Sequence, residues 1–404
     1  MNCSSQINYQ IIKTTSDLKD VAQVLAKENM VAVDLEADSM YHFKEKVCLV
    51  QMAAKGINAI IDPLDVKDLS PLKPLFKDKN IKKIFHGSDY DIRSLHRDFN
   101  IEVNNLFDTQ LASMFLGIKA TGLDAVLKTR FNVDIDKKYQ KKDWSQRPLP
   151  KEMLEYAARD VGFLIPLTEI LEGELEKKGR FSWITEECGL LTRVRHKTNN
   201  SEPLYLNFNG AGLLDPRSLA VLEALLKFRL KIAQKKDKPL YKILENKPLI
   251  QIALEKPVNG NQLKKMRILG KKQIEMYGAK LIEIIKNELE KSSHDLPVYP
   301  RKAPLVPGHL DHIKIKALKL KIKALKSWRS KRAQQVGIDP GILLNNTILN
   351  KIIVLNPEKQ KDLFQIENMK KWQINTFGNE IIKFLKKDNY SADMYGNRYN
   401  QIKP

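Results

Sequence analysis

Hydrophobic positions in the first half of the chain recur at two spacings, one typical of strands and the other of helices. Short β-branched runs, such as the Met-Val-Ala-Val that begins at Met30, indicate strands buried on both faces. Such runs predict strands at Ile7–Ile12, Met30–Glu36, Val47–Ala53, Ile57–Ile61 and Lys83–His86. The segments between and after them predict helices at Ser16–Lys27, Ser88–Arg97, Thr109–Gly117, Leu123–Phe131 and Pro150–Lys178, the last with a break near Pro166. We expect Ser16 and Ser88 to cap their helices, and the alternation predicts an α/β domain with a mixed sheet.

From about residue 210 onward the strand patterns mostly stop, helices dominate, and the sequence repeats itself. Residues 100 positions apart correspond at widely separated places, which indicates an internal duplication. The matching positions are Ala224-Leu225 and Ala324-Leu325, Arg229 and Arg329, Ala233-Gln234 and Ala333-Gln334, Leu263 and Leu363, Lys271 and Lys371, Gln273 and Gln373, and Gly278 and Gly378. The second half therefore predicts two copies of one helical module, near residues 213–292 and 312–388. The second copy is the more divergent, because Leu269-Gly270 is replaced by Met369-Lys370.

The segment between the two copies has the composition of a spacer. Ser292–Gly308 contains four prolines, which is typical of an extended, semi-rigid linker. A chain of 404 residues is also too long for one ordinary core. We therefore predict an α/β domain over residues 1–205, a first helical domain over 206–296 and a second over 297–404.

The net charge of +21 is placed almost entirely in the helical half. Residues 1–200 contain 30 Lys and Arg against 29 Asp and Glu, whereas residues 201–404 contain 39 against 19. A basic half of this size favours a polyanionic partner, usually nucleic acid. The alternative is a lysine-rich surface without a partner. The densest basic stretch consists of Lys314, Lys316, Lys319, Lys321, Lys323, Lys326, Arg329, Lys331 and Arg332.

Composition narrows the class of protein further. Hydrophobic residues make up 43% and charged residues 29%, which is typical of a folded globular protein. No run approaches the roughly 18 apolar residues of a membrane span, and Met1–Gln10 lacks a signal pattern. Three scattered cysteines are too few for a disulfide framework or a zinc site. We expect a cytoplasmic protein with no membrane partner.

Three short motifs place carboxylates where a predicted strand or helix presents them. Asp34 and Glu36 end a buried strand, and alternation puts both on one face, where they repel each other unless a cation offsets their charge. Asp91 lies near the start of a predicted helix. Tyr156 and Asp160 are spaced by four on a predicted helix and so share a face.

Each motif has a bland interpretation when it is taken alone. Most D-x-E triplets are surface residues, and a half-buried Tyr followed by an exposed Asp is common. Acidic residues also suit a first helical turn, and we assign that role to Asp89. Asp91 lies further in and is able to point back toward the strand ends.

Together, in this order and spacing, the motifs resemble those of the DEDDy family of 3′–5′ exonucleases over residues 8–200. Residues 47–53, 105–109 and 143–149 add to the likeness, which within the family is greatest to ribonuclease D. The helical repeat resembles the HRDC module (helicase and RNase D C-terminal), two copies of which follow the exonuclease in bacterial ribonuclease D. HRDC modules also follow RecQ-type helicases, but this sequence lacks their G-x-x-x-x-G-K-[ST] phosphate loop.

The resemblance implies a ribonuclease H-like fold and two divalent metal ions, Mg²⁺ or Mn²⁺, about 3.5–4 Å apart. Asp34 would bridge both ions. Glu36 and Asp160 would hold the ion that carries the attacking water, and Asp91 would hold the other ion through water. Tyr156 would orient the attacking water. The products would be nucleoside 5′-monophosphates released from a 3′ end.

Substrate contacts are predicted at Leu35, Trp144 and Arg147. Trp144 and Arg147 precede the Tyr156 helix and would contact a base and a phosphate near the 3′ end. The alternative is a Trp that closes the core and an Arg paired with a carboxylate. We favour a structural role for His86. Four lysines before this segment would line the entrance for the strand: Lys137, Lys138, Lys141 and Lys142.

The leading functional hypothesis is an exoribonuclease that trims tRNA precursors and other structured RNAs with a single-stranded 3′ end. A DNA 3′–5′ exonuclease is an alternative, because proofreading domains share this metal site. An RNA-binding adaptor with an inactive nuclease domain is the non-enzymatic alternative. No protein partner is inferable from the sequence.

Overall fold

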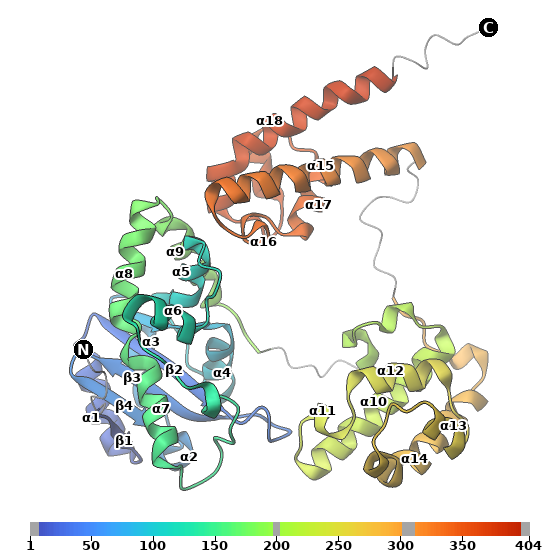
Figure 1. Ribbon diagram of the computed structural model, residues 1–404, viewed down its shortest axis with the longest axis horizontal. Helices are drawn as coiled ribbons and strands as arrows, with labels where there is room; N and C mark the ends of the chain where they lie inside the picture. The colour runs from blue at the N-terminus through green and yellow to red at the C-terminus, as the bar shows by residue number, and fades with distance from the viewer. Residues whose placement is uncertain (1–7, 197–202, 301–311, 397–404) are drawn as a thin grey trace.

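The computed structural model describes residues 8–196, 203–300 and 312–396 (Figure 1). Three folded parts follow one another along the chain: an α/β part and two helical modules. Ile7 and Cys3, as well as Pro304 and Pro307 of the predicted linker, lie outside the described residues. Within those residues no helix is long and apolar enough to cross a bilayer.

A six-stranded mixed sheet forms the centre of the α/β part, in the order β1-β4-β3-β2-β5-β6. β3 runs antiparallel to both β2 and β4, and the remaining neighbours are parallel. The strands are β1 Gln10–Ile12, β2 Met30–Ala37, β3 Val47–Ala54, β4 Ile57–Ile61, β5 Lys82–Phe85 and β6 Leu106–Asp108. The predicted mixed-sheet α/β class is therefore confirmed.

Nine helices belong to the described α/β part. They are α1 Thr15–Leu25, α2 Pro63–Val66, α3 Lys73–Lys77, α4 Asp89–Phe99, α5 Thr109–Leu116, α6 Leu123–Phe131, α7 Lys151–Gly162, α8 Leu164–Lys177 and α9 Phe181–Leu191. The cap predicted at Ser16 is wrong, since the Thr14 side chain accepts a hydrogen bond from the Asp17 amide.

The helix predicted from Pro150, with a break near Pro166, is two helices, α7 and α8, which separate at Phe163. The break lies before Pro166 because a proline ring clashes with the carbonyl group four residues earlier, here that of Gly162. Pro166 itself stands in the first turn of α8, where a missing amide hydrogen costs nothing.

The two faces of the sheet pack against different parts of the α/β domain. Val31, Val33 and Leu35 of β2 join the largest hydrophobic core. The alternate residues of β2 face α7, which packs on β2, β3 and β4. Side chains on this second face of β2 therefore lie beneath α7.

Each helical module has one long first helix and one long last helix. The first module contains α10 Pro216–Lys236, α11 Leu240–Ile243, α12 Asn246–Glu255, α13 Gly260–Lys265 and α14 Lys271–Glu290. The second contains α15 His312–Val336, α16 Pro340–Leu343, α17 Asn346–Leu355 and α18 Lys371–Gly396. Short 3₁₀ turns occur at Ser70–Leu72, Lys137–Tyr139, Leu204–Asn207, Ala211–Leu213, Ser293–Asp295 and Gln360–Gln365.

Equivalent residues of the two modules make equivalent contacts. Arg229 donates from Nη1 to the carbonyl oxygen of Leu244 at 3.0 Å, and Arg329 donates to that of Leu344 at 2.7 Å. Arg229 also donates to the Asn246 side chain and Arg329 to the Asn346 side chain, in each case two residues after the leucine. The duplication is thus visible in three dimensions, whereas the boundaries at residues 205/206 and 296/297 stay predictions.

Candidate active site

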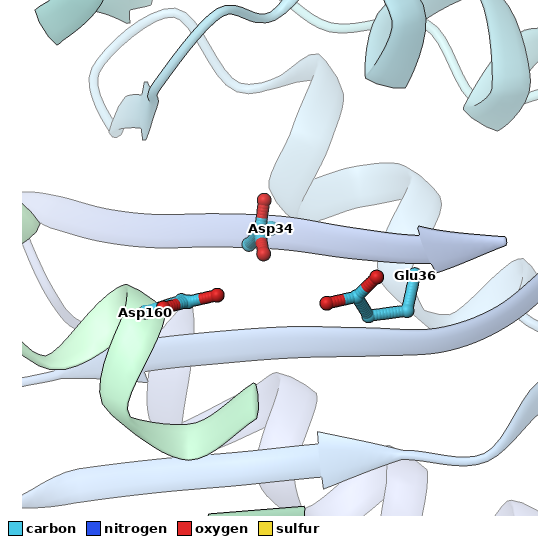
Figure 2. A group of neighbouring side chains, drawn as sticks. All are labelled: Asp34, Glu36 and Asp160. Carbon is cyan, nitrogen blue, oxygen red and sulfur yellow. The ribbon is translucent and has the colours of Figure 1, made fainter. Parts of the chain in front are cut away.

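Strand β2 and helix α7 bring three carboxylates together over the face of the sheet that α7 covers. Asp34 and Glu36 project from the same face of β2, and Asp160 reaches them from α7 (Figure 2). Each residue offers a ligand oxygen within 4.8 Å of those of the other two. The spacing permits one cation to contact all three side chains.

Asp91 of α4 is 7% exposed and is not one of the three carboxylates whose oxygens converge. Burial, and then the negative charge of Asp34, raise its pKa. The start of α4 is held by Asp108, whose carboxylate accepts hydrogen bonds from the Gly87 and Ser88 amides at 3.0 and 2.7 Å. Ser88 does not cap the helix as predicted, because its hydroxyl donates to Asp108 instead.

The four carboxylates resist ionisation in the absence of a cation. Burial raises the pKa of Asp34 to about 6. Burial and then the charge of Asp34 raise the pKa values of Glu36, Asp91 and Asp160 well above their usual range. A bound cation would relieve both causes, since it compensates for lost hydration and for repulsion. Carboxylate oxygens without nitrogen or sulfur ligands fit a hard divalent cation.

Tyr156 stands one turn before Asp160 on α7. Burial, and then the charges of Asp160 and Glu36, raise the pKa of the phenol above its usual value. The hydroxyl group therefore stays protonated at neutral pH and acts as a hydrogen-bond donor. Its ring is fixed between Tyr139 and Trp144, with ring centroids 5.9 and 6.2 Å away.

Asp34, Glu36, Asp160 and Tyr156 line a pocket of about 330 Å³, and Asp91 does not reach it. The rest of its lining includes His86 and Lys137, which the sequence singled out, and also Gly87, Gln110, Gly122, Leu123, Asp124, Ile135 and Gln140. No spacing in the sequence marks Gln110, Ile135 or Gln140, because only the folded chain brings them to the site. Leu35 also lines this pocket, although its side chain belongs to the main core.

His86 is tied to its surroundings through both ring nitrogens. Nδ1 lies 2.9 Å from Thr109 Oγ1, and Nε2 lies 2.9 Å from the Thr121 carbonyl oxygen. The ring thus holds the pocket wall to β5, in agreement with the structural role that we favoured.

Trp144 and Arg147 make the contacts of the structural alternative, and the substrate contacts stay a prediction. Trp144 is 1% exposed and packs in a small core with Leu49 and Met153, so its ring is not open to a base. Arg147 donates from Nε and Nη2 to the buried Asp62 carboxylate at 2.7 and 2.8 Å. Its guanidinium group is therefore already occupied by a carboxylate and by backbone carbonyl groups.

Three other charged residues that the sequence singled out, Asp89, Lys137 and Lys138, lie at the rim of the pocket or outside it. Asp89 is exposed and pairs with Arg93 on the same helix, as expected for a surface residue. Lys137 pairs with Asp124 at 2.8 Å, and both residues line the pocket. Lys138, which pairs with Asp136, lies outside the pocket.

Comparison with known proteins gives the class of the chain in two parts. Residues 9–176 match the model of the 3′–5′ exonuclease family, and residues 218–285 and 322–385 each match the HRDC domain. The chain is thus an exonuclease domain followed by two HRDC domains.

Similar proteins with the same layout narrow this class. Ribonuclease D of Nitrobacter hamburgensis is 30% identical, over 71% of this chain and 76% of that protein. Ribonuclease D of Bartonella henselae is 29% identical over 93% and 90% of the two chains. The crystal structure of Escherichia coli RNase D superposes with a TM-score of 0.69 at 24% identity and covers 94% of this chain and 99% of that one. The chain belongs to the ribonuclease D family and is a hydrolase, a 3′–5′ exoribonuclease.

Proposed function

We propose that Asp34, Glu36, Asp91 and Asp160 hold two divalent cations, Mg²⁺ or Mn²⁺, and that Tyr156 completes the catalytic site. The observation that carries this proposal is the convergence of three ligand oxygens within 4.8 Å of one another in a buried setting. When bound, the two cations would supply positive charge that stabilises the attacking and leaving oxygens of an in-line displacement at phosphorus.

Asp34 is the carboxylate whose charge most affects the other three. After burial, it is the largest cause of the raised pKa values of Glu36, Asp91 and Asp160. Asp34 would therefore hold the cations in common with the other carboxylates, and Asp91, which lies outside the group of three, would complete the set.

Tyr156 would orient the attacking water rather than deprotonate it. A phenol whose pKa is raised keeps its proton, so it is a poor general base but a good hydrogen-bond partner. Its ring is fixed by Tyr139 and Trp144, so the hydroxyl position is defined before substrate arrives. Leu35 and the opposite pocket wall would then receive the 3′-terminal nucleotide.

The substrate that we propose is RNA with a single-stranded 3′ end, such as a tRNA precursor, from which nucleoside 5′-monophosphates are released. The relatives are ribonucleases D, and the helical half of this chain carries 39 Lys and Arg against 19 Asp and Glu. Phosphate contacts made by such a surface are independent of sequence and add affinity for structured RNA.

The test is release of mononucleotides from a labelled RNA and from a DNA strand of matched sequence, with Mg²⁺ or Mn²⁺ and with a chelator. Asp34→Asn and Asp160→Asn should abolish cleavage while RNA binding survives. Tyr156→Phe should slow turnover more than it weakens binding. Full Mg²⁺-dependent activity in Asp34→Asn would contradict the metal assignment, and equal digestion of DNA would contradict the substrate assignment.

A further inference from the structure

Gln51 lies at the centre of β3, directly opposite Asp34 of β2 in the antiparallel ladder. Directly opposed residues project to the same face of a sheet, with Cβ atoms about 4.5–5.5 Å apart. The Gln51 side chain therefore shares the sheet face that carries Asp34 and Glu36. It is fully buried.

The Gln51 amide has no hydrogen-bond partner among the described residues, at either Oε1 or Nε2. Buried side-chain amides are nearly always bonded, so an unbonded one requires an explanation. Asp160 Oδ1 is likewise buried and unbonded within the described parts of the chain. An unused donor and an unused carboxylate oxygen thus lie on the same face of the sheet, both next to Asp34.

Helix α7 closes this face and leaves the amide few other partners. Ala157 and Ala158 of α7 pack in one cluster with Leu49 of β3 and Ile60, which neighbours Gln51 on β4. Asn58 lies two ladder pairs away, and its Nδ2 donates to the Ala158 carbonyl oxygen at 2.8 Å, while its Oδ1 is buried and unbonded in the described structure. The Asp34 carboxylate, directly opposite Gln51 in the ladder, is nearer to it along the sheet than Asn58 is.

We infer that Gln51 is a positioning residue for the metal site, whose Nε2 donates to the Asp34 and Asp160 carboxylates when they hold a divalent cation. This inference rests on the proposed function. The amide fixes the direction of the carboxylate lone pairs and stays neutral, so it adds no charge to the site. Partners of this kind behind metal ligands typically contribute about 10- to 100-fold in metal affinity.

The experiment compares wild type with Gln51→Met, which keeps the length of the side chain and removes both polar atoms. Mn²⁺ binding is measured by calorimetry, and Tm is measured with chelator and with saturating Mn²⁺. With chelator, Gln51→Met should be as stable as wild type or more stable, because an unbonded buried amide has been replaced by an apolar group. Its Mn²⁺ affinity should fall at least about 10-fold, and the Mn²⁺-induced rise in Tm should shrink accordingly.

Asn58→Leu is the matched control on the same sheet face. It removes the bond to Ala158 and should lower Tm with chelator while Mn²⁺ affinity is retained. If Gln51 only packed under α7, Gln51→Met would keep the Mn²⁺ affinity of wild type, and that result would overturn the inference. Wild type that binds no Mn²⁺ would instead overturn the proposed function, so the two failures are distinguishable.

Discussion

The two helical modules share one fold but attach to the nuclease domain in different ways. Both use the residue that follows their first long helix: Asp237 after α10, and Gly337 after α15. Asp237 accepts hydrogen bonds from the nuclease domain. Gly337 lies so close to Gly117, at the end of α5, that a Cβ atom added to Gly117 would be 2.0 Å from the Gly337 carbonyl oxygen.

The second module is docked through buried aromatic and charged groups. Trp372 stacks on Trp183 of α9 with ring centroids 4.6 Å apart, and its indole nitrogen donates to Glu187 at 2.8 Å. Lys370 donates to the same carboxylate. The Glu186 carboxylate accepts from two backbone amides at the start of α18. The cores of the nuclease domain and of this module form one continuous hydrophobic cluster.

The first module meets the tip of the β2–β3 hairpin, which reaches toward α11 in Figure 1, through polar contacts and through Phe43, which packs against the core of this module. His42 Nδ1 lies 2.6 Å from the Asp237 carboxylate, and the two side chains are 27% and 61% exposed. The Tyr241 hydroxyl donates to the Met40 carbonyl oxygen at 3.2 Å. The core of this module is separate from that of the nuclease.

The comparison shows that the second module has diverged where it contacts the nuclease domain. The replacement of Leu269-Gly270 by Met369-Lys370, together with Trp372 in place of Lys272, supplies the docking residues of the second module. The substitutions that make the second copy more divergent in sequence form its interface with the nuclease domain. The second module shares one continuous hydrophobic core with the nuclease domain, whereas the first module has a separate core.

The largest expected effect is that of Trp372→Ala. Trp372 is 3% exposed, so truncation should lower the free energy of unfolding of the nuclease domain by about 3–5 kcal/mol. Lys272→Ala, at the equivalent exposed position of the first module, should leave it unchanged. Urea denaturation measures both variants. Equal stabilities would show that the aromatic interface does not hold the second module.

Gly117→Ala should have the next largest effect, because its new Cβ would collide with the Gly337 carbonyl oxygen. Gly179→Ala is the control, since Gly179 also has a positive φ but no described atom within 4 Å of the added Cβ. The left-handed backbone should cost each variant about 1–2 kcal/mol. Overpacking should cost Gly117→Ala about 1–3 kcal/mol more. Identical Tm values for Gly117→Ala and Gly179→Ala would mean that the Gly337 backbone moves away from the added Cβ without loss of stability.

Lys370→Ala should destabilise the protein by about 1–3 kcal/mol, because it leaves the Glu187 carboxylate buried with fewer hydrogen bonds. Adding Glu187→Gln removes the stranded charge and should recover part of the loss. A double-mutant cycle in thermal unfolding measures the coupling. Additive effects would argue that the pair does not act as a unit.

Asp237→Asn should have the smallest effect, with no measurable change in Tm, but it should widen the range of positions of the first module in small-angle X-ray scattering. The hydrogen bond from His42 lowers the pKa of Asp237, so its contribution is present above the usual pKa and lost as the pH falls through the lowered one. Wild type should therefore match the variant only below about pH 4. A wild-type scattering profile that already matches the variant at pH 7 would show that the contact between His42 and Asp237 does not position the first module.

Local patterns predicted much of the fold but little of the assembly. β2, β3 and β4 were expected within one residue of their ends, because their apolar runs are continuous in the sequence. Asp34, Glu36 and Asp160 were expected to meet, and their oxygens do lie together, although their roles stay proposals. The burial of Trp144 and the pairing of Arg147 with Asp62 depend on contacts between residues far apart in the sequence, and no local periodicity encodes them.

The crowded carboxylates also have a consequence for the lifetime of the protein in a cell. Without a cation, burial of ionised groups opposes folding, and this cost grows as the pH rises from the usual carboxyl pKa to the raised values and is constant above them. A ligand that binds only the folded chain stabilises it by mass action, by about 1.4 kcal/mol for each tenfold excess over its Kd. A cell depleted of divalent cations would therefore hold a larger unfolded fraction of this chain, and proteases would remove it. Ion supply would thus set the abundance of the nuclease as well as its activity.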